Sequence, residues 1–315
     1  MNFEDAMEEW EPINSVDPRE LTEARLQAHW AVQIIGGTGE ALVSHEPGFS
    51  HTSMSWLEGA RMLAGQATTL RGLRVALRIA DMTMHVLDGS QRSVAFFELD
   101  GLTLGEALQE TIRILCDGIG AEIFLPPEIP TYQMPGHPVS RGAPFRAAAR
   151  EHREELARWY ANAARFESVV TGTVPGASPV RCWPHHFDIA TLIALDSPSK
   201  EAETARSIGF GLSPGDSSYD EPYFYVNPWP FPEVRTGHAD LPGGAHWHTN
   251  GWFGAVLRAS RIEAHDAREQ ARQVQEYVIA ALAADRAILG ESSERPGLSS
   301  ASNAGLPEGR TEGGS

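Results

Sequence analysis

The chain has 315 residues, of which 42 are acidic and 25 basic, so its formal net charge is −17. That balance argues against a nucleic-acid-binding protein, which needs basic surface to displace counterions from phosphate, and against docking on an anionic membrane. No apolar run approaches the roughly 20 residues of a transmembrane helix, and the acidic N-terminus is unlike a signal peptide. Because only Cys116 and Cys182 occur, no disulfide framework is expected, and we predict a cytoplasmic protein.

The composition also disfavours several enzyme classes. Lys200 is the only lysine, which excludes a phosphate-binding P-loop and argues against Schiff-base chemistry. The glycines of residues 35–39 lack the strand–turn–helix context of a dinucleotide fold, so we predict a hairpin or loop there. No Gly-x-Ser-x-Gly elbow is present. Kinases, P-loop NTPases, Rossmann dehydrogenases and ordinary α/β-hydrolases are therefore disfavoured.

Residues 1–20 are acidic and interrupted by prolines, and we predict a mobile arm. The N-terminal half, residues 21–127, begins with helical spacing over 20–35. A second helix is predicted to begin at Thr103, where Thr103 and Glu106 have the form of a capping box, and to stop at Gly118. Apolar or alternating runs predict strands at residues 41–43, 51–57, 74–87, 93–99 and 121–125.

A proline-rich crossover over residues 128–144 separates this half from the C-terminal half, residues 145–289. Amphipathic helices are predicted there over 145–166 and 264–289. Residues 290–315 are predicted to be a disordered tail, because they have almost nothing to bury. Strands are predicted at residues 187–195, 205–212, 222–226 and 245–259. The expected fold is α+β, with predominantly antiparallel sheets in two halves that each carry packed amphipathic helices.

The strand over residues 187–195 is the best candidate for carrying a functional site. Side chains alternate across a strand, so Phe187 and Ile189 share one face, while His186 and Asp188 share the other with further apolar residues. A strand that is apolar on both faces is expected inside a domain. We therefore expect Asp188 to be paired, because an unpaired buried polar group costs about 1–3 kcal/mol.

Histidines suggest a metal site. In a strand His246, His248 and Asn250 share a face, as do His186 and Asp188. If the two strands are neighbours, His186, Asp188, His246 and His248 are the predicted ligands of a divalent metal such as Zn, Mn or Fe. The alternative is that these histidines form hydrogen-bonded core or edge pairs.

Residues 209–229 predict a ligand-binding face. Tyr223 and Tyr225 share one side of a strand that Asp220 and Glu221 precede. Aromatic side chains with acids at the rim suit a small polar or cyclic ligand, and Glu221 and Asp220 are the predicted catalytic acid–base residues. An aromatic sheet layer beside an Asp–Pro turn is the alternative. The predicted ligand-binding side chains are Tyr223, Tyr225, Asn250 and Arg181.

His45 and His51 flank a Pro-Gly turn in the N-terminal half. Either histidine is a candidate to complete a site from this half of the chain. The alternative is a surface-loop position for both.

These stretches carry a family resemblance. Ser178-Pro-Val with Phe187-Asp-Ile-Ala, and Gly209-Phe-Gly with Asp220-Glu-Pro-Tyr-Phe-Tyr, resemble the uncharacterised bacterial family called domain of unknown function 5996. The resemblance spans residues 26–289. It departs from the family at Arg181 and at His185-His186, so it carries over Asp188, Asp220 and Glu221 and implies no activity.

The leading hypothesis is a metal-dependent hydrolase acting on a small molecule in a pocket between the two halves, with Glu221 as general base. The alternative is a non-catalytic module that binds a small molecule or a partner. A structural or interaction protein is the third hypothesis.

Truncation after Gly290 should leave the melting temperature unchanged, because the removed residues lack apolar periodicity. Thermal denaturation of the truncated and full chains checks this, and a drop of several degrees would contradict it.

Overall fold

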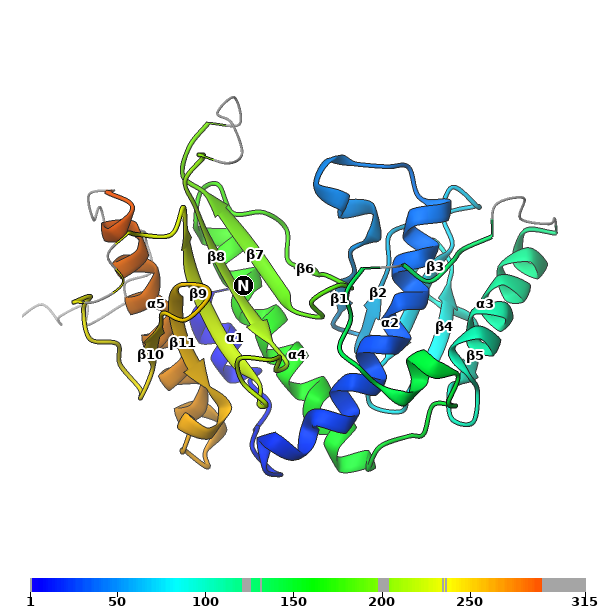
Figure 1. The fold of residues 1–315 in the computed structure, drawn as a ribbon, viewed down its shortest axis with the longest axis horizontal. Coiled ribbons are helices and arrows are strands. Elements are labelled where there is room, and N and C mark those ends of the chain that lie inside the picture. The colour runs from blue at the N-terminus through cyan, green and yellow to red at the C-terminus, as the bar shows by residue number, and fades with distance from the viewer. Residues whose placement is uncertain are drawn as a thin grey trace, which may run out of the picture.

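The computed structural model describes residues 2–120, 126–130, 132–197, 204–233, 235 and 237–290. Its strands form two sheets, one of five strands and one of six, and helices pack against both (Figure 1). Every pair of neighbouring strands is antiparallel. The predicted α+β fold with predominantly antiparallel sheets is therefore confirmed.

The N-terminal sheet is a meander in which each strand pairs with the next along the chain. Helix α2 (Thr22–Leu42) packs on this sheet and on α3 (Leu104–Ile119). The predicted capping box is present, because the Thr103 hydroxyl accepts from the Glu106 N–H and the Glu106 carboxylate accepts from the Thr103 N–H. The strands are β1 (Ser55–Leu57), β2 (Met62–Ala64), β3 (Arg74–Arg78), β4 (Thr83–Leu87) and β5 (Ser93–Glu98).

The C-terminal sheet has the order β10-β11-β9-β8-β7-β6. Helix α4 (Arg150–Thr173) covers β7 and β8, and α5 (Ala267–Ile288) lies against β9 and β11 (Figure 1). The strands are β6 (Arg181–Cys182), β7 (Ile189–Ala194), β8 (Ser207–Ser213), β9 (Tyr223–Trp229), β10 (His246–His248) and β11 (Gly254–Arg258). Short 3-10 helices are η1 (Pro18–Leu21), η2 (Pro47–Thr52), η3 (Pro138–Arg141) and η4 (Ala259–Arg261).

Several predicted strands have other boundaries in the structure. The run over 74–87 is two strands, because the chain reverses after β3 at Met82, which has a positive φ of 53°. The run over 245–259 likewise divides into β10 and β11, so Asn250 lies in the turn between them and not on the face of His246 and His248. The expected strand over 41–43 is instead the end of α2.

The glycines of residues 36–39 lie inside α2, and the predicted hairpin or loop is wrong. They are explained by close backbone contacts from elsewhere in the chain. A Cβ atom on Gly37 would lie 2.1 Å from the carbonyl oxygen of Glu128, and one on Gly39 would lie 2.5 Å from that of His51. Glycine therefore allows two loops to cross this helix at contact distance.

The prediction of a mobile arm over residues 1–20 is also wrong. Helix α1 (Phe3–Glu8) packs on α4 and α5, and Phe3, Trp10 and Ile13 are buried in the core. Gln270 of α5 fixes the chain at Ile13, whose N–H it accepts at 3.0 Å and to whose carbonyl it donates at 2.9 Å. The burial of these apolar side chains fixes the segment despite its acidic composition, and Glu9 and Glu11 lie next to arginines.

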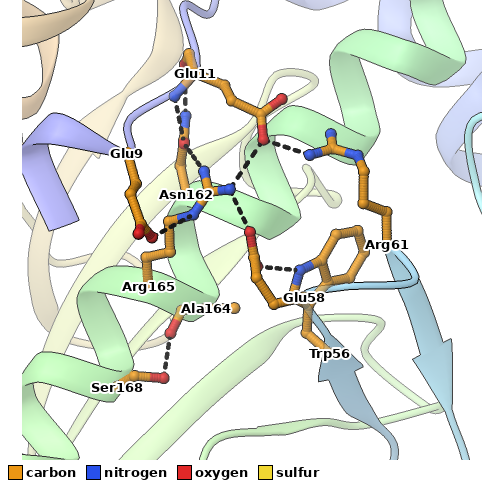
Figure 2. Close-up of polar contacts among 9 residues, drawn as sticks. All are labelled: Glu9, Glu11, Trp56, Glu58, Arg61, Asn162, Ala164, Arg165 and Ser168. Atoms are coloured by element: carbon orange, nitrogen blue, oxygen red, sulfur yellow. Dashed lines mark hydrogen bonds and ion pairs between the residues drawn. The ribbon is translucent and has the colours of Figure 1, made fainter. Parts of the chain in front are cut away.

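A network of charges holds that N-terminal segment, α4 and the β1–β2 hairpin together (Figure 2). Arg165 of α4, with its side chain 9% exposed, donates to Glu11 at 3.1 Å and to Glu58, and Glu9 lies 3.8 Å away. Arg61 pairs with Glu11 from the other side. Burial opposes ionisation of Glu11, but hydrogen bonds and charge from Arg61 and Arg165 outweigh it and lower the pKa of this carboxyl.

A second connection joins the two sheets directly. Met54, just before β1, exchanges backbone hydrogen bonds of 2.9 and 2.8 Å with Cys182 of β6.

The predicted strand over 121–125 and nearly all of the predicted tail over 290–315 lie outside the described residues. Among the helices described, none has the length and apolar character needed to cross a membrane.

Arg165→Leu should lower the free energy of unfolding by about 1–3 kcal/mol, because Glu58 loses its arginine partner and Glu11 keeps only Arg61. Urea denaturation measures this loss. The control is Arg92→Leu, which removes a guanidinium that pairs with Asp88 but is 80% exposed, and should cost less than about 1 kcal/mol. Equal small losses in both variants would contradict a stabilising role for the network.

Candidate functional site

Two adjoining cavities lie between the halves. The larger, of about 1250 Å³, is lined by residues of α2, η2, residues 126–130 and the start of the C-terminal sheet. The smaller, of about 800 Å³, is lined by the start of α2, residues 133–136 and the ends of β8 and β9. We call the two together the interhalf groove. Its floor is the set of residues that line both cavities, namely His185, His186, Asp188, Tyr225 and Asn227.

A tight turn before β7 places three of these side chains. The Phe187 N–H donates to the Trp183 carbonyl at 2.7 Å, and the Trp183 N–H donates to the Asp188 carbonyl at 3.0 Å. Phe187 closes the turn with a positive φ of 57°, a strained conformation for an aromatic residue. The turn therefore needs support from the surrounding structure.

Helices from both halves supply that support. From α4, the Tyr160 hydroxyl donates to the Phe187 carbonyl at 2.5 Å. From α2, His29 stacks on the Phe187 ring, and both His29 and Gln33 donate to the Pro184 carbonyl, at 3.0 and 2.7 Å. Since a carbonyl only accepts, His29 carries its proton on Nε2. Burial lowers the pKa of His29 to about 4, so the ring is neutral near pH 7.

Asp188 and Tyr225 form the polar centre of the floor. The Tyr225 hydroxyl donates to Asp188 Oδ2 at 2.5 Å, whereas Oδ1 is shielded from water and has no hydrogen-bond partner in the described part of the chain. Burial raises the pKa of Asp188, and the bond from Tyr225 with the nearby His186 and His185 offsets only part of this effect. The prediction that Asp188 is paired is thus borne out for one oxygen.

Further titratable groups lie beneath the floor. Glu167 of α4 is fully buried, and its desolvation, together with the charge of Asp188, raises its pKa well above the usual range. Two neighbouring carboxyls cannot both ionise cheaply in such surroundings. Cys182 is also fully buried, and burial raises the pKa of its thiol, as expected for an inert cysteine.

The mouth of the larger cavity carries exposed apolar side chains beside the exposed acids Glu40 and Glu128. Leu192 of β7 is 51% exposed, and Phe49 of η2 is 69% exposed on the opposite side. The face of β7 that carries Ala190 and Leu192 was expected inside a domain, but it forms a wall of the groove. Arg181, a predicted ligand-binding residue, lines this cavity and donates to the Ser53 hydroxyl at 2.9 Å.

The structure does not bring the four predicted metal ligands together. His186 and Asp188 adjoin β7, whereas His246 and His248 lie on β10, four strands away, or roughly 19 Å at the usual strand spacing. Tyr219 lies within hydrogen-bond distance of both, 2.8 Å from His246 Nε2 and 2.7 Å from His248 Nδ1. Both histidines are hydrogen-bonded to the Tyr219 hydroxyl at the edge of the sheet, which fits the alternative that the sequence left open.

The predicted catalytic acids lie outside the groove. Glu221 is buried, and its carboxylate accepts from the Ser260 N–H at 2.6 Å and the Ser260 hydroxyl at 2.9 Å, with Arg258 alongside. Asp220 is exposed and, like Asn250, does not line either cavity. Of the predicted ligand-binding residues, Tyr225, Tyr223 and Arg181 do line the groove.

Within the described residues, one group of potential metal ligands lies close together, namely Glu40, His45 and His51, of which Glu40 lines the larger cavity. The Glu46 N–H donates to His51 Nδ1 at 3.2 Å, so the proton of the neutral ring is on Nε2, which donates to Glu40 at 2.9 Å. The rings of His45 and His51 stack with their centroids 4.5 Å apart. Because His51 Nδ1 accepts from the Glu46 N–H, a metal on Nε2 would leave the ring without a proton on either nitrogen. We therefore interpret the group as a hydrogen-bonded cluster.

No protein-family model, curated protein or solved structure matches this chain. The resemblance described above therefore stays a prediction.

Sequence reasoning missed the side chains that support the floor, namely His29, Gln33, Tyr160 and Glu167, and also Arg25. Polar residues on the apolar faces of two predicted helices were the available signal, since Glu167 and Gln33 need partners or a reason to be buried.

His29→Gln should flatten the pH dependence of stability between pH 6.5 and about 4. Burial in the folded protein holds the pKa of His29 below its ordinary value. The contribution of this group to the free energy of unfolding is therefore complete above pH 6.5. It is lost as the pH falls towards 4, because the unfolded chain takes up the proton first. This group contributes a slope of up to about 1.4 kcal/mol per pH unit. Urea denaturation of both proteins across this range measures the difference, and parallel profiles would refute the assignment.

Proposed function

We propose that the protein binds a small molecule in the interhalf groove, over the floor formed by Asp188 and Tyr225. The observation that carries this proposal is the position of Asp188. A carboxyl with a raised pKa and one unpartnered oxygen lies where two cavities meet. Perturbed carboxyls in clefts are typical of functional sites.

The local energetics support the proposal. The positive φ of Phe187 costs on the order of 1–3 kcal/mol, and an unpartnered buried oxygen costs a similar amount. Other buried acids differ in their surroundings: Ser260 satisfies Glu221, whereas Glu167 and Asp285 have unpartnered oxygens in the described structure but line neither cavity. At Phe187 and Asp188 the strained backbone and the unpartnered oxygen fall on adjacent residues where two cavities meet, and such a combination is expected where function requires it.

The shape and lining of the groove favour a ligand with apolar and polar parts. Each cavity is in or near the range of roughly 300–1000 Å³ that is usual for small-molecule sites. Phe49 and Leu192 offer apolar surface at the mouth, whereas Asp188 and Tyr225 offer hydrogen bonds at the floor.

Metal-assisted hydrolysis, the leading hypothesis from sequence, has less support. His246 and His248 lie four strands from Asp188, and Glu221 is committed to Ser260. The non-catalytic small-molecule-binding module is therefore the function that we favour. Of the three positions that the family resemblance carries over, only Asp188 lines the groove.

Asp188→Asn tests the proposal against a structural role. If Asp188 serves binding, the variant should be as stable as the wild type or more stable, because it removes a carboxyl that the fold leaves poorly paired. Glu221→Gln is the matched control and should lose about 1–3 kcal/mol, because it disrupts satisfied hydrogen bonds to a buried charge. Thermal and urea denaturation measure both variants.

A thermal-shift screen of small polar and amphiphilic metabolites completes the test. Compounds that raise the melting temperature of the wild type should lose this effect in Asp188→Asn, whereas Glu221→Gln should retain it. The proposed site would be rejected if Asp188→Asn lost as much stability as Glu221→Gln. It would also be rejected if the compounds raised the melting temperature of Asp188→Asn as much as that of the wild type. Asp188 would then have a structural role.

A further inference from the structure

Arg25, in the first turns of α2, is a buried cation without a described partner. It is 8% exposed, and its Nε and Nη1 atoms are shielded from water with no hydrogen bond in the described part of the chain. Burial lowers the pKa of its guanidinium, and the more distant charge of Asp216 opposes that effect. A buried charge is expected to have a counter-charge, because its desolvation is otherwise uncompensated.

Asp216, the acid whose charge acts most on Arg25, has its hydrogen bonds elsewhere. Asp216 accepts from the Ser218 N–H at 2.7 Å, from the Tyr219 N–H at 3.2 Å and from the Tyr223 hydroxyl at 2.7 Å. Gly215, at a φ of +111°, lets the loop pack directly on Arg25, since a Cβ atom there would lie 2.5 Å from Nη1. The loop thus holds the guanidinium in place without neutralising it.

Arg25 lines the smaller cavity of the groove, which shares its floor of Asp188 and Tyr225 with the larger one. Among the residues that line this smaller cavity in the described structure, Arg25 is the single arginine and none is a lysine. The wall of this cavity includes the apolar side chains of Leu26, Met134, Phe231 and Trp252, and also the carboxyl groups of Asp188 and Asp216.

We propose that Arg25 binds the carboxylate of an amphiphilic small molecule whose apolar body lies against this wall. The inference rests on the proposed function, and it names the class of ligand. Nη2 is the guanidinium nitrogen that is not among the shielded atoms of Arg25, so it can donate a charge-assisted hydrogen bond to a carboxylate oxygen. One guanidinium beside the negative Asp216 suits a single negative charge better than the double charge of a phosphate.

The experiment compares straight-chain carboxylates from acetate to hexanoate with their uncharged amides and with inorganic phosphate, at constant ionic strength. Calorimetric melting and titration of the full chain give the affinities. The carboxylates should bind and the amides should not. Each added methylene should tighten the dissociation constant by up to about fourfold, as apolar surface is buried.

Arg25→Met should weaken carboxylate binding about tenfold or more, and Arg25→Lys should retain part of it, because lysine keeps the positive charge. Without ligand, Arg25→Met should melt at or above the wild-type temperature. The matched control is Arg74→Met, which removes a half-buried arginine bonded to the Gly65 and Ala64 carbonyls. It should lower the melting temperature and leave carboxylate binding unchanged.

Equal effects of carboxylates and amides, no binding of any carboxylate, or wild-type binding by Arg25→Met would each overturn the inference. Phosphate or chloride binding as tightly as the carboxylates would show a general anion site and would also overturn it. If Arg25→Met does not fold, the comparison of carboxylates with amides on the wild type decides. Ligands that need Asp188 but not Arg25 would leave the proposed function standing without this inference.

Discussion

The burial of α4 between the two halves is the constraint on which the rest of the structure depends. Its polar side chains face different neighbours, and each fixes one of them. Glu155 accepts from the N-terminal segment at Asn14 and Ser15, and Arg165 holds the acids of that segment and of the β1–β2 hairpin. Tyr160 holds the turn that presents Asp188. A single helix therefore sets the geometry of both the fold and the groove.

Helix α4 carries buried titratable side chains of two kinds, some paired and others not. Glu155 pairs with Arg158, and Arg165 pairs with Glu11. Such paired groups stabilise the arrangement of segments that are far apart in the sequence. Nearer the groove, Glu167 and Asp188 lie together where both cannot ionise at low cost, and burial raises the pKa of each. Because of this contrast, we propose the binding site at the groove and assign a structural role to the charge network of Arg165.

Two groups in the groove lack a hydrogen-bond partner or a counter-charge on the described protein. Asp188 has one unpartnered oxygen, and the buried guanidinium of Arg25 has no described counter-charge. Both line the smaller cavity, whose walls are otherwise mainly apolar or aromatic. We propose that a ligand with one carboxylate and an apolar body binds to Arg25 in this cavity, which Asp216 also lines.

The sequence by itself determined the α+β class, the antiparallel plan and the capped start of α3, because these follow from local periodicity and from residues within one turn of each other. It also identified Asp188 and Tyr225, since alternation along a strand assigns side chains to faces. Only the tertiary structure decided that His248 lies far from His186, because the order of strands in a sheet is set by packing. The glycines of α2, the docking of Trp10 and the isolation of Arg25 were likewise hidden, since each depends on contacts with residues distant in the chain.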